Sequence, residues 1–214
     1  MQVAVLGAGT MGHGIAQVSA MAGHTVQIRD IEEEFVDDGL AAIEANLDAG
    51  IERDKVTEDE AEATLDRLSG TTSLEEAVTD ADIVVEAVPE EMDIKHDTVT
   101  EVESYVDRDT LIASNTSSLS LTEIASALDH PDRAVGLHFF NPVHIMSLVE
   151  IVVAEQSSDE TVDRAHEFVE GIEKTPVEVM DSPGFASSRL GVALGVEAMR
   201  MVEEGVASPE DIDT

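Results

Sequence analysis

The chain has 214 residues, enough to bury a substantial hydrophobic core and to form one domain, or one domain and part of a second. Its 47 acidic residues against 11 lysines and arginines give a formal net charge of −36, which argues against nucleic acids and anionic membrane surfaces as partners. The absence of cysteine excludes disulfides and thiolate chemistry, and no segment resembles a membrane span or a signal peptide, so we expect a cytoplasmic protein.

Strand and helix patterns alternate along most of the chain. Short apolar runs predict strands at 2–7, 24–30, 81–88, 110–115, 133–139, 147–154 and 175–180. Helical spacing predicts helices at 11–22, 91–106, 121–128 and 159–172, and an acidic helical stretch from about 32 to 68 that breaks near AGIERDK. This alternation predicts an α/β fold with a mostly parallel sheet and helices on both faces.

Acidic residues cluster on the predicted helix surfaces, as in IEEEFVDD and TEDEAEATLD, and the chain holds few aromatic residues. Lysine is scarce, occurring only at Lys55, Lys95 and Lys174. The regular apolar patterns argue against disorder, the usual alternative for an acidic chain. This composition resembles the surfaces of proteins from salt-loving organisms, where a Debye length of about 3 Å at molar salt screens self-repulsion. We therefore expect a halophilic protein.

The glycine-rich stretch GAGTMG follows the first predicted strand and opens the first predicted helix. Gly7 permits a tight turn, Gly9 lets the backbone approach a pyrophosphate, and Gly12 allows close packing of helix on strand. Asp30, at the end of the second strand, can accept hydrogen bonds from ribose hydroxyls and would repel a 2′-phosphate. A glycine turn without a ligand is the alternative. The pattern predicts a site for NAD rather than NADP, formed by Gly7, Gly9, Thr10, Met11, Gly12 and Asp30.

The pattern changes at Pro183, where PGFASSRLGVALGVEAMRMVEEGV is typical of a helix. Its apolar residues lie on nearly every side: Phe185, Leu190, Val192, Leu194, Val196, Met199, Met201 and Val202. A helix that is apolar on every side must be covered on every side. We therefore predict one domain at 1–181 and, at 182–214, the beginning of an incomplete helical domain that a partner or a further segment covers.

The stretch GLHFFNP, residues 136–142, places His138 at the end of a predicted apolar strand. A buried histidine that bonds a neighbouring carbonyl is one interpretation, and an imidazole that transfers protons near neutral pH is the other. Glu150 lies in the next predicted strand, although taken alone it is more typical of a solvated acid at a sheet edge. His144 follows closely, but no third ligand stands at metal spacing, so we predict no metal site.

Five segments in chain order resemble the L-3-hydroxyacyl-CoA dehydrogenase family, of the 3-hydroxybutyryl-CoA dehydrogenase type: VAVLGAGTMGHGIA, DIVVEAVPEEMDIK, IASNTSSLS, GLHFFNPVHIMSLVEIV and DSPGF. They span nearly the whole chain, and the combination of SNTSS, HFFNP and LVEIV is highly specific. The resemblance implies a Rossmann-type NAD-binding domain followed by an all-helical substrate and dimerisation domain, which in family members continues beyond the length of this chain. It also implies reversible, NAD-dependent oxidation of a short-chain L-3-hydroxyacyl-CoA by a homodimer.

The resemblance implies roles for residues of the matching motifs. His138 corresponds to the catalytic base, and Glu150 to the carboxylate that would fix the imidazole tautomer and stabilise the imidazolium. Ser117 corresponds to the serine that bonds the substrate oxygen. The remaining correspondences are Asn141 beside the catalytic pair, Asn115, Glu90 and Lys95 on the cofactor side, and Arg53 and Lys55 near the CoA phosphates.

These smaller correspondences have structural alternatives: a cap or turn for the two asparagines, a polar helix start for Glu90 and Lys95, and an exposed turn for Arg53 and Lys55. Ser188 departs from the family, whose members usually carry an asparagine that helps to hold the acyl-CoA. Losing such a donor costs about 2.7–4 kcal/mol when nothing replaces it. Two rival functions therefore stay open: a dehydrogenase for a different 3-hydroxy acid, and a non-catalytic or partner-dependent NAD-binding module.

Overall fold

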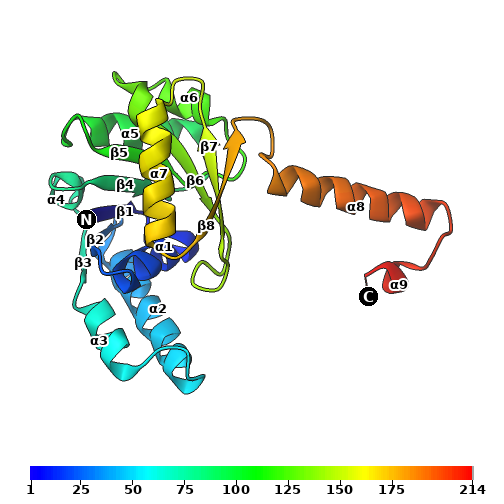
Figure 1. Cartoon of the computed structure of the whole chain (residues 1–214), viewed down its shortest axis with the longest axis horizontal. Coiled ribbons are helices and arrows are strands. Elements are labelled where there is room, and N and C mark those ends of the chain that lie inside the picture. Colours follow the sequence, from blue (N-terminus) through cyan, green and yellow to red (C-terminus); the bar gives the residue numbers. More distant parts are fainter. Residues whose placement is uncertain (214) are drawn as a thin grey trace.

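Eight strands form one sheet in the computed structural model, which describes residues 1–213 (Figure 1). The strands are β1 Gln2–Leu6, β2 Thr25–Arg29, β3 Leu68–Thr71, β4 Ile83–Glu86, β5 Leu111–Ser114, β6 Ala134–Phe139, β7 Leu148–Val153 and β8 Thr175–Met180. They lie in the order β3-β2-β1-β4-β5-β6-β7-β8, and neighbours are parallel except for β6 and β7. The predicted mostly parallel sheet is confirmed.

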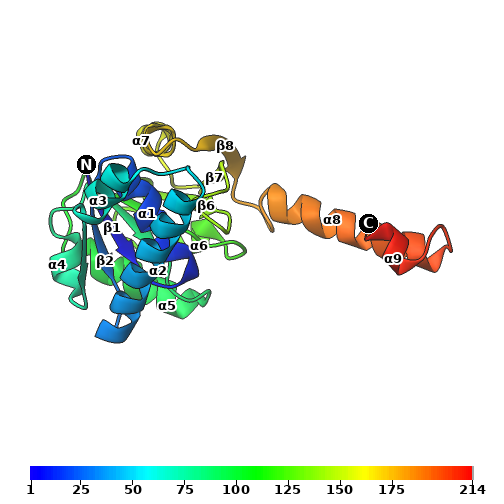
Figure 2. The ribbon, with the colours of Figure 1, turned by 90° about the horizontal axis from the view of Figure 1, so that it is seen from below.

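Helices cover both faces of this sheet, as predicted (Figure 2). The helices are α1 Thr10–Met21, α2 Glu33–Glu52, α3 Glu58–Leu65, α4 Leu74–Val78, α5 Met92–Glu103, α6 Leu121–Ala125, α7 Asp159–Gly171, α8 Ser187–Glu203 and α9 Pro209–Ile212, with a 3-10 turn η1 at Pro131–Arg133. One face carries α1, α2 and α7, with α3 packed beside α1 and α2, and the other face carries α4, α5 and α6. Within residues 1–213, none of the helices is long and apolar enough to cross a lipid bilayer.

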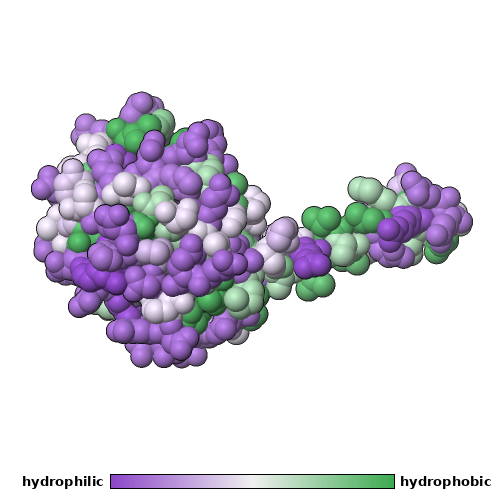
Figure 3. All heavy atoms as spheres, turned by 90° about the horizontal axis from the view of Figure 1, so that it is seen from above, coloured by the Kyte–Doolittle hydropathy of each residue, from purple (hydrophilic) through white to green (hydrophobic). Residues whose placement is uncertain are grey.

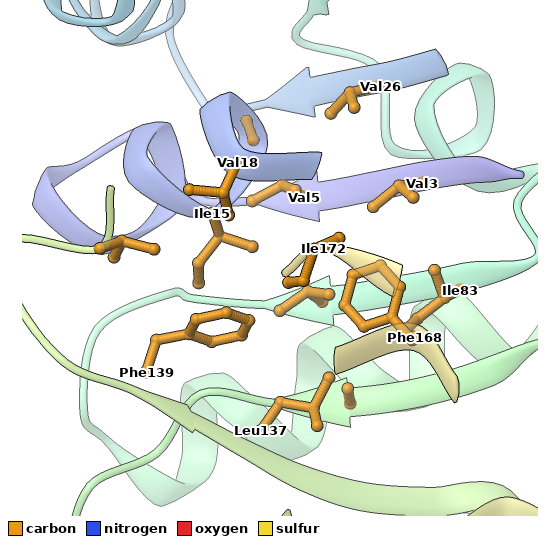
Figure 4. Packing of buried hydrophobic residues seen from close by; sticks show 14 of the residues in the cluster. Val3, Val5, Ile15, Val18, Val26, Ile83, Leu137, Phe139, Phe168 and Ile172 are labelled. Atoms are coloured by element: carbon orange, nitrogen blue, oxygen red, sulfur yellow. The ribbon is translucent and has the colours of Figure 1, made fainter. Parts of the chain in front are cut away.

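The sheet buries side chains on both faces because successive residues of a strand point to opposite sides. In β1, Val3 and Val5 pack in the cluster that faces α1 and α7, whereas Ala4 and Leu6 pack in the cluster on the opposite face. Figure 4 shows the first cluster, in which Phe168 of α7 lies over the strands. Burial on both faces explains why the central strands have continuous apolar runs rather than alternating patterns.

The edge strand β3 and the short helix α4 were not predicted, and the expected helical stretch ends at Leu65 rather than near residue 68. The segment LSGT is too polar to show a strand pattern and pairs only with β2. Its Gly70 packs under α2, where a Cβ would come within 2.3 Å of a Val36 methyl carbon. This strand therefore forms by backbone pairing to β2 and not by an apolar signal of its own.

Helix α8 leaves the body of the molecule and projects away from it (Figure 1). None of its residues is buried, and it exposes the apolar side chains Leu190, Val192, Leu194, Val196, Met199 and Val202. The space-filling view shows these apolar atoms along the projecting arm (Figure 3). Its apolar residues are left uncovered among the described residues, in line with the predicted need for a cover.

Candidate active site

His138 and Glu150 face each other across β6 and β7. The antiparallel register pairs the two residues, so their side chains leave the sheet on the same face. Imidazole Nδ1 lies 2.7 Å from carboxylate Oε2, and the residues are only 6% and 1% exposed. An ionised carboxylate only accepts hydrogen bonds, so Nδ1 carries the proton and Nε2 of the neutral ring remains an acceptor. The structure therefore brings together the two residues expected to form the acid–base pair.

Two aromatic rings enclose the imidazole of His138. The centroid of Phe140 lies 4.5 Å from that of His138, and the centroid of Phe185 lies 5.7 Å away. Phe185 is buried although its φ is 47°, a left-handed conformation that costs about 1–2 kcal/mol for a residue with a side chain. In this conformation Phe185 packs within the core cluster on the face of α4, α5 and α6, and its ring also lies beside the histidine.

The carboxylate of Glu150 is also held by the segment that opens α8. Its Oε1 accepts hydrogen bonds from the amides of Ala186 (3.1 Å) and Ser187 (2.8 Å), and its Oε2 accepts one from the Ser187 hydroxyl (2.8 Å). Burial alone would raise the pKa of Glu150, but the bonds from His138, Ser187 and Ala186 outweigh burial and hold that pKa below its ordinary value. Sequence patterns did not reveal Ala186 and Ser187 as functional, because their contact with Glu150 is formed only by the fold.

Glu90, between β4 and α5, accepts hydrogen bonds from the loop that carries Ser117. Its Oε1 accepts from the hydroxyls of Thr116 (2.8 Å), Ser117 (3.2 Å) and Ser118 (3.0 Å), and from the amides of Ser117 (2.8 Å) and Ser118 (3.1 Å). Burial would raise the pKa of Glu90, but these bonds and the nearby Lys95 lower it to about 2. The structure thus brings Glu90 and Ser117 together, with Ser117 exposed.

Lys95 lies beneath Glu90 rather than on the surface. Its side chain is 1% exposed, and its ammonium lies 2.7 Å from Oε1 of Glu86 and 3.4 Å from Oε2 of Glu90. The Ser114 hydroxyl donates to the second oxygen of Glu86 at 2.6 Å. Within this network the ammonium of Lys95 is paired with Glu86 and Glu90. A direct contact with the cofactor stays a prediction.

The glycine loop has the geometry that its sequence predicts. Gly7 has a φ of 100°, and a Cβ there would come within 2.6 Å of the Ala87 carbonyl oxygen. At Gly12 a Cβ would overlap the Gly7 carbonyl, so only glycine allows α1 to lie this close to β1. At Gly9, by contrast, no atom lies within 4 Å of the Cβ position, which leaves the backbone open to a ligand.

Asp30 ties the glycine loop to the end of β2. Its Oδ2 accepts from the Ala8 amide and its Oδ1 from the Ile31 amide, both at 2.7 Å. Thr10 is exposed in the first turn of α1, whereas the side chain of Met11 packs against the core. A contact from Met11 to a cofactor would therefore come from its backbone.

The two predicted asparagines differ in their environment. Asn115 follows β5 and accepts a hydrogen bond from the Phe139 amide at 3.0 Å, so it joins the ends of β5 and β6. Asn141 is exposed and precedes Pro142 by a cis peptide bond. Ser188 is half-buried in the first turn of α8, one residue beyond the serine that binds Glu150.

Comparisons with known proteins agree with this geometry. The family profile described as "3-hydroxyacyl-CoA dehydrogenase, NAD binding domain" matches residues 2–182, and "3-hydroxyacyl-CoA dehydrogenase, C-terminal domain" matches 184–214. The chain belongs to the 3-hydroxyacyl-CoA dehydrogenase family. A 3-hydroxybutyryl-CoA dehydrogenase of Clostridioides difficile is 40% identical over 213 residues, which cover 100% of this chain and 75% of that protein. A probable 3-hydroxybutyryl-CoA dehydrogenase of Deinococcus radiodurans is 43% identical over 213 residues, which cover 100% of this chain and 76% of that protein.

Solved structures show the same relationship. The crystal structure of an (S)-3-hydroxybutyryl-CoA dehydrogenase from Ralstonia eutropha has a TM-score of 0.95 and is 39% identical. The match covers 98% of this chain and 74% of that one. In this member of the 3-hydroxyacyl-CoA dehydrogenase family, the join between the two profiles falls between β8 and α8, so Glu150 belongs to the first matched region and Ser187 to the second.

Cationic residues gather in one pocket of this family member. The pocket has a volume of about 680 Å³ and lies among α1, α3, the end of α7 and the segment between β6 and β7. Lys55, Arg67 and Lys174 line it together with the imidazole of His144 and the carboxylates of Glu60 and Glu173. Arg53 caps the end of α2, and burial together with the charges of Lys174, His13 and Arg53 lowers the pKa of His144. Three basic side chains against two acidic ones make this pocket more positive than the average surface of so acidic a molecule.

Proposed function

We propose that the protein catalyses the reversible, NAD-dependent oxidation of short-chain L-3-hydroxyacyl-CoA to 3-oxoacyl-CoA. The observation that carries the proposal is the buried His138–Glu150 pair at the carboxyl end of β6, in a chain of this family. The relatives named 3-hydroxybutyryl-CoA dehydrogenases support the choice of a short acyl group.

The acid–base pair would remove the proton of the substrate hydroxyl. Nε2 of His138 accepts this proton during oxidation, while Nδ1 remains bonded to Glu150 at 2.7 Å. The adjacent carboxylate keeps the tautomer fixed and stabilises the imidazolium that forms. In the reverse direction the same Nε2 returns the proton to the carbonyl oxygen.

The residues present fit NAD, which when bound supplies the acceptor for the hydride. The open backbone at Gly9 and the N-terminus of α1 would hold the pyrophosphate, and Asp30 would accept from the adenosine ribose. On the nicotinamide side, Glu90 and Asn115 stand at the ends of β4 and β5.

The substrate would lie between His138 and the cationic pocket. Ser117 would bond the substrate oxygen, and Asn141 and Ser188 would border the acyl group. Arg53 and Lys55 would meet the CoA phosphates, because phosphates need local positive charge on a molecule with net charge −36. Lys55 lines this pocket and the charge of Arg53 acts on His144 in its wall, which supports an acyl-CoA contact for both residues.

The same proposal divides the chain into two regions. Residues 1–181 would form the NAD-binding domain, and residues 182–214 the beginning of a helical substrate and dimerisation domain. The projection of α8 from the body and its exposed apolar residues support both the boundary and a homodimer.

The test is an NADH assay with acetoacetyl-CoA in molar KCl, comparing wild type with His138→Ala. In this direction His138 is the proton donor, and its loss should lower kcat by about 10²–10⁴ and leave NAD binding unchanged. His166→Ala is a matched control, since His166 of α7 forms a surface pair with Glu178 at 3.4 Å. The same acyl group on N-acetylcysteamine should show a higher KM. Wild-type activity retained in His138→Ala would show that another group is the base.

A further inference from the structure

Ser187 contacts the acid–base pair at the atom where its two members meet. The hydroxyl of Ser187 lies 2.8 Å from Oε2 of Glu150, the same oxygen that binds Nδ1 of His138 at 2.7 Å. The amide of Ser187 binds the other carboxylate oxygen at 2.8 Å. One residue thus contacts both oxygens of a carboxylate that is 1% exposed.

These bonds determine how the carboxylate is oriented. With Oε1 held by two backbone amides and Oε2 by a hydroxyl, rotation of the carboxyl group out of this plane would leave part-buried donors without an acceptor. The hydroxyl must be the donor, because an ionised carboxylate only accepts. It therefore shares Oε2 with the imidazole and draws negative charge away from the Nδ1 bond.

We propose that Ser187 is a positioning residue, which locks the Glu150 carboxylate against Nδ1 of His138 and links the first turn of α8 to the acid–base pair. The kinetic consequence of this inference rests on the proposed function, whereas the geometric consequence does not. Ser187 is 37 residues from Glu150 in sequence and lies in the second of the two matched regions. The orientation of α8 and the position of the Glu150 carboxylate against His138 are therefore coupled.

Other charged groups nearby are engaged elsewhere. Glu178 of β8 pairs with His166 on α7, and Asp181 accepts from Ser120 and from the amide of Thr122 beside α6. Among the described residues, His138 is the titratable group bonded to Glu150, and Arg189 in the first turn of α8 is exposed. A change at Ser187 should therefore act on the Glu150–His138 bond and not through a second ion pair.

The experiment compares wild type, Ser187→Ala, Ser187→Thr and Ser182→Ala by ¹⁵N NMR of the histidine side chains in the intact chain without substrate. In Ser187→Ala, the Nδ1–H resonance of His138 should shift, and its proton should exchange with water several-fold faster, because Oε2 loses the hydroxyl that holds it while the two backbone amides hold only Oε1. Ser187→Thr keeps the hydroxyl and should restore the wild-type signal. Ser182 lies five residues earlier, and Ser182→Ala should leave it unchanged.

The kinetic arm measures kcat/KM for oxidation against pH. Without the Ser187 hydroxyl, more negative charge stays on Oε2 beside Nδ1 and stabilises the imidazolium, so the acid limb should move to higher pH in Ser187→Ala and return in Ser187→Thr. Ser187→Ala spectra that coincide with those of Ser182→Ala, or a shift that Ser187→Thr fails to reverse, would overturn the proposal. Wild type without turnover would refute the proposed function alone, because the NMR comparison needs no substrate.

Discussion

Asp30 is the side chain that we propose discriminates between NAD and NADP. Its carboxylate is fixed by the amides of Ala8 and Ile31, so its charge stands at the end of β2 beside the glycine loop. Asp30→Ala should weaken NAD binding by about tenfold or more, since a hydrogen bond to a charged group contributes roughly 1.5–3 kcal/mol. The preference over NADP should narrow, because the charge that repels a 2′-phosphate is removed.

Fluorescence titration with both dinucleotides measures this change. Asp38→Ala removes the same charge from an exposed position on α2 and should leave both affinities nearly unchanged. An unaltered NAD affinity in Asp30→Ala would remove Asp30 from the cofactor site.

At the scale of elements, Glu90 fastens the loop after β5 to the segment before α5. Its pKa is lowered from 4.5 to about 2, so its ionised form binds the loop donors more strongly in the folded chain than in the unfolded chain. This contribution to stability is fully present above about pH 4.5 and is lost as the pH falls toward about 2. Glu90→Gln should therefore be less stable than wild type at pH 6, with a difference that shrinks by pH 3.

Urea unfolding at pH 6, 4 and 3 measures that difference. The neighbouring Glu91 is exposed, so Glu91→Gln should show no comparable dependence on pH. A constant difference between wild type and Glu90→Gln at every pH would show that its charge does not hold the loop.

For the whole molecule, the net charge of −36 predicts that stability depends on salt concentration. Repulsion among exposed carboxylates extends about 10 Å at 0.1 M salt and about 3 Å at 1 M, so added salt screens it. We propose that the protein is halophilic in this sense. The melting temperature should rise between 0.1 and 2 M KCl and level off once screening is complete.

Differential scanning calorimetry measures the melting temperature in KCl and in sucrose of equal osmolality. The comparison separates screening of the surface charges from stabilisation by solutes that are excluded from the protein surface. Excluded solutes strengthen burial whatever the charge. Equal stabilisation by sucrose would mean that screening of the acidic surface is not the cause.

Patterns within short segments were enough to predict much of this molecule. Apolar runs predicted the central strands, and the spacing of its glycines predicted the glycine loop. Both patterns depend on contacts between residues close in sequence. The candidate base was predicted as well, since His138 ends an apolar strand in a motif typical of the family. The strand β3 was missed because its polar residues are held by pairing to β2.

The sequence by itself determined the alternation of strands and helices and the position of the glycine loop, and it singled out His138 as the candidate base. Only the tertiary structure decided that Lys95 is buried beneath Glu90, and that Ser187 and Ala186 donate hydrogen bonds to the carboxylate of Glu150. The physical reason is distance along the chain. A hydrogen bond between residues 37 apart exists only once β7 and the start of α8 have packed, and no local pattern records that packing.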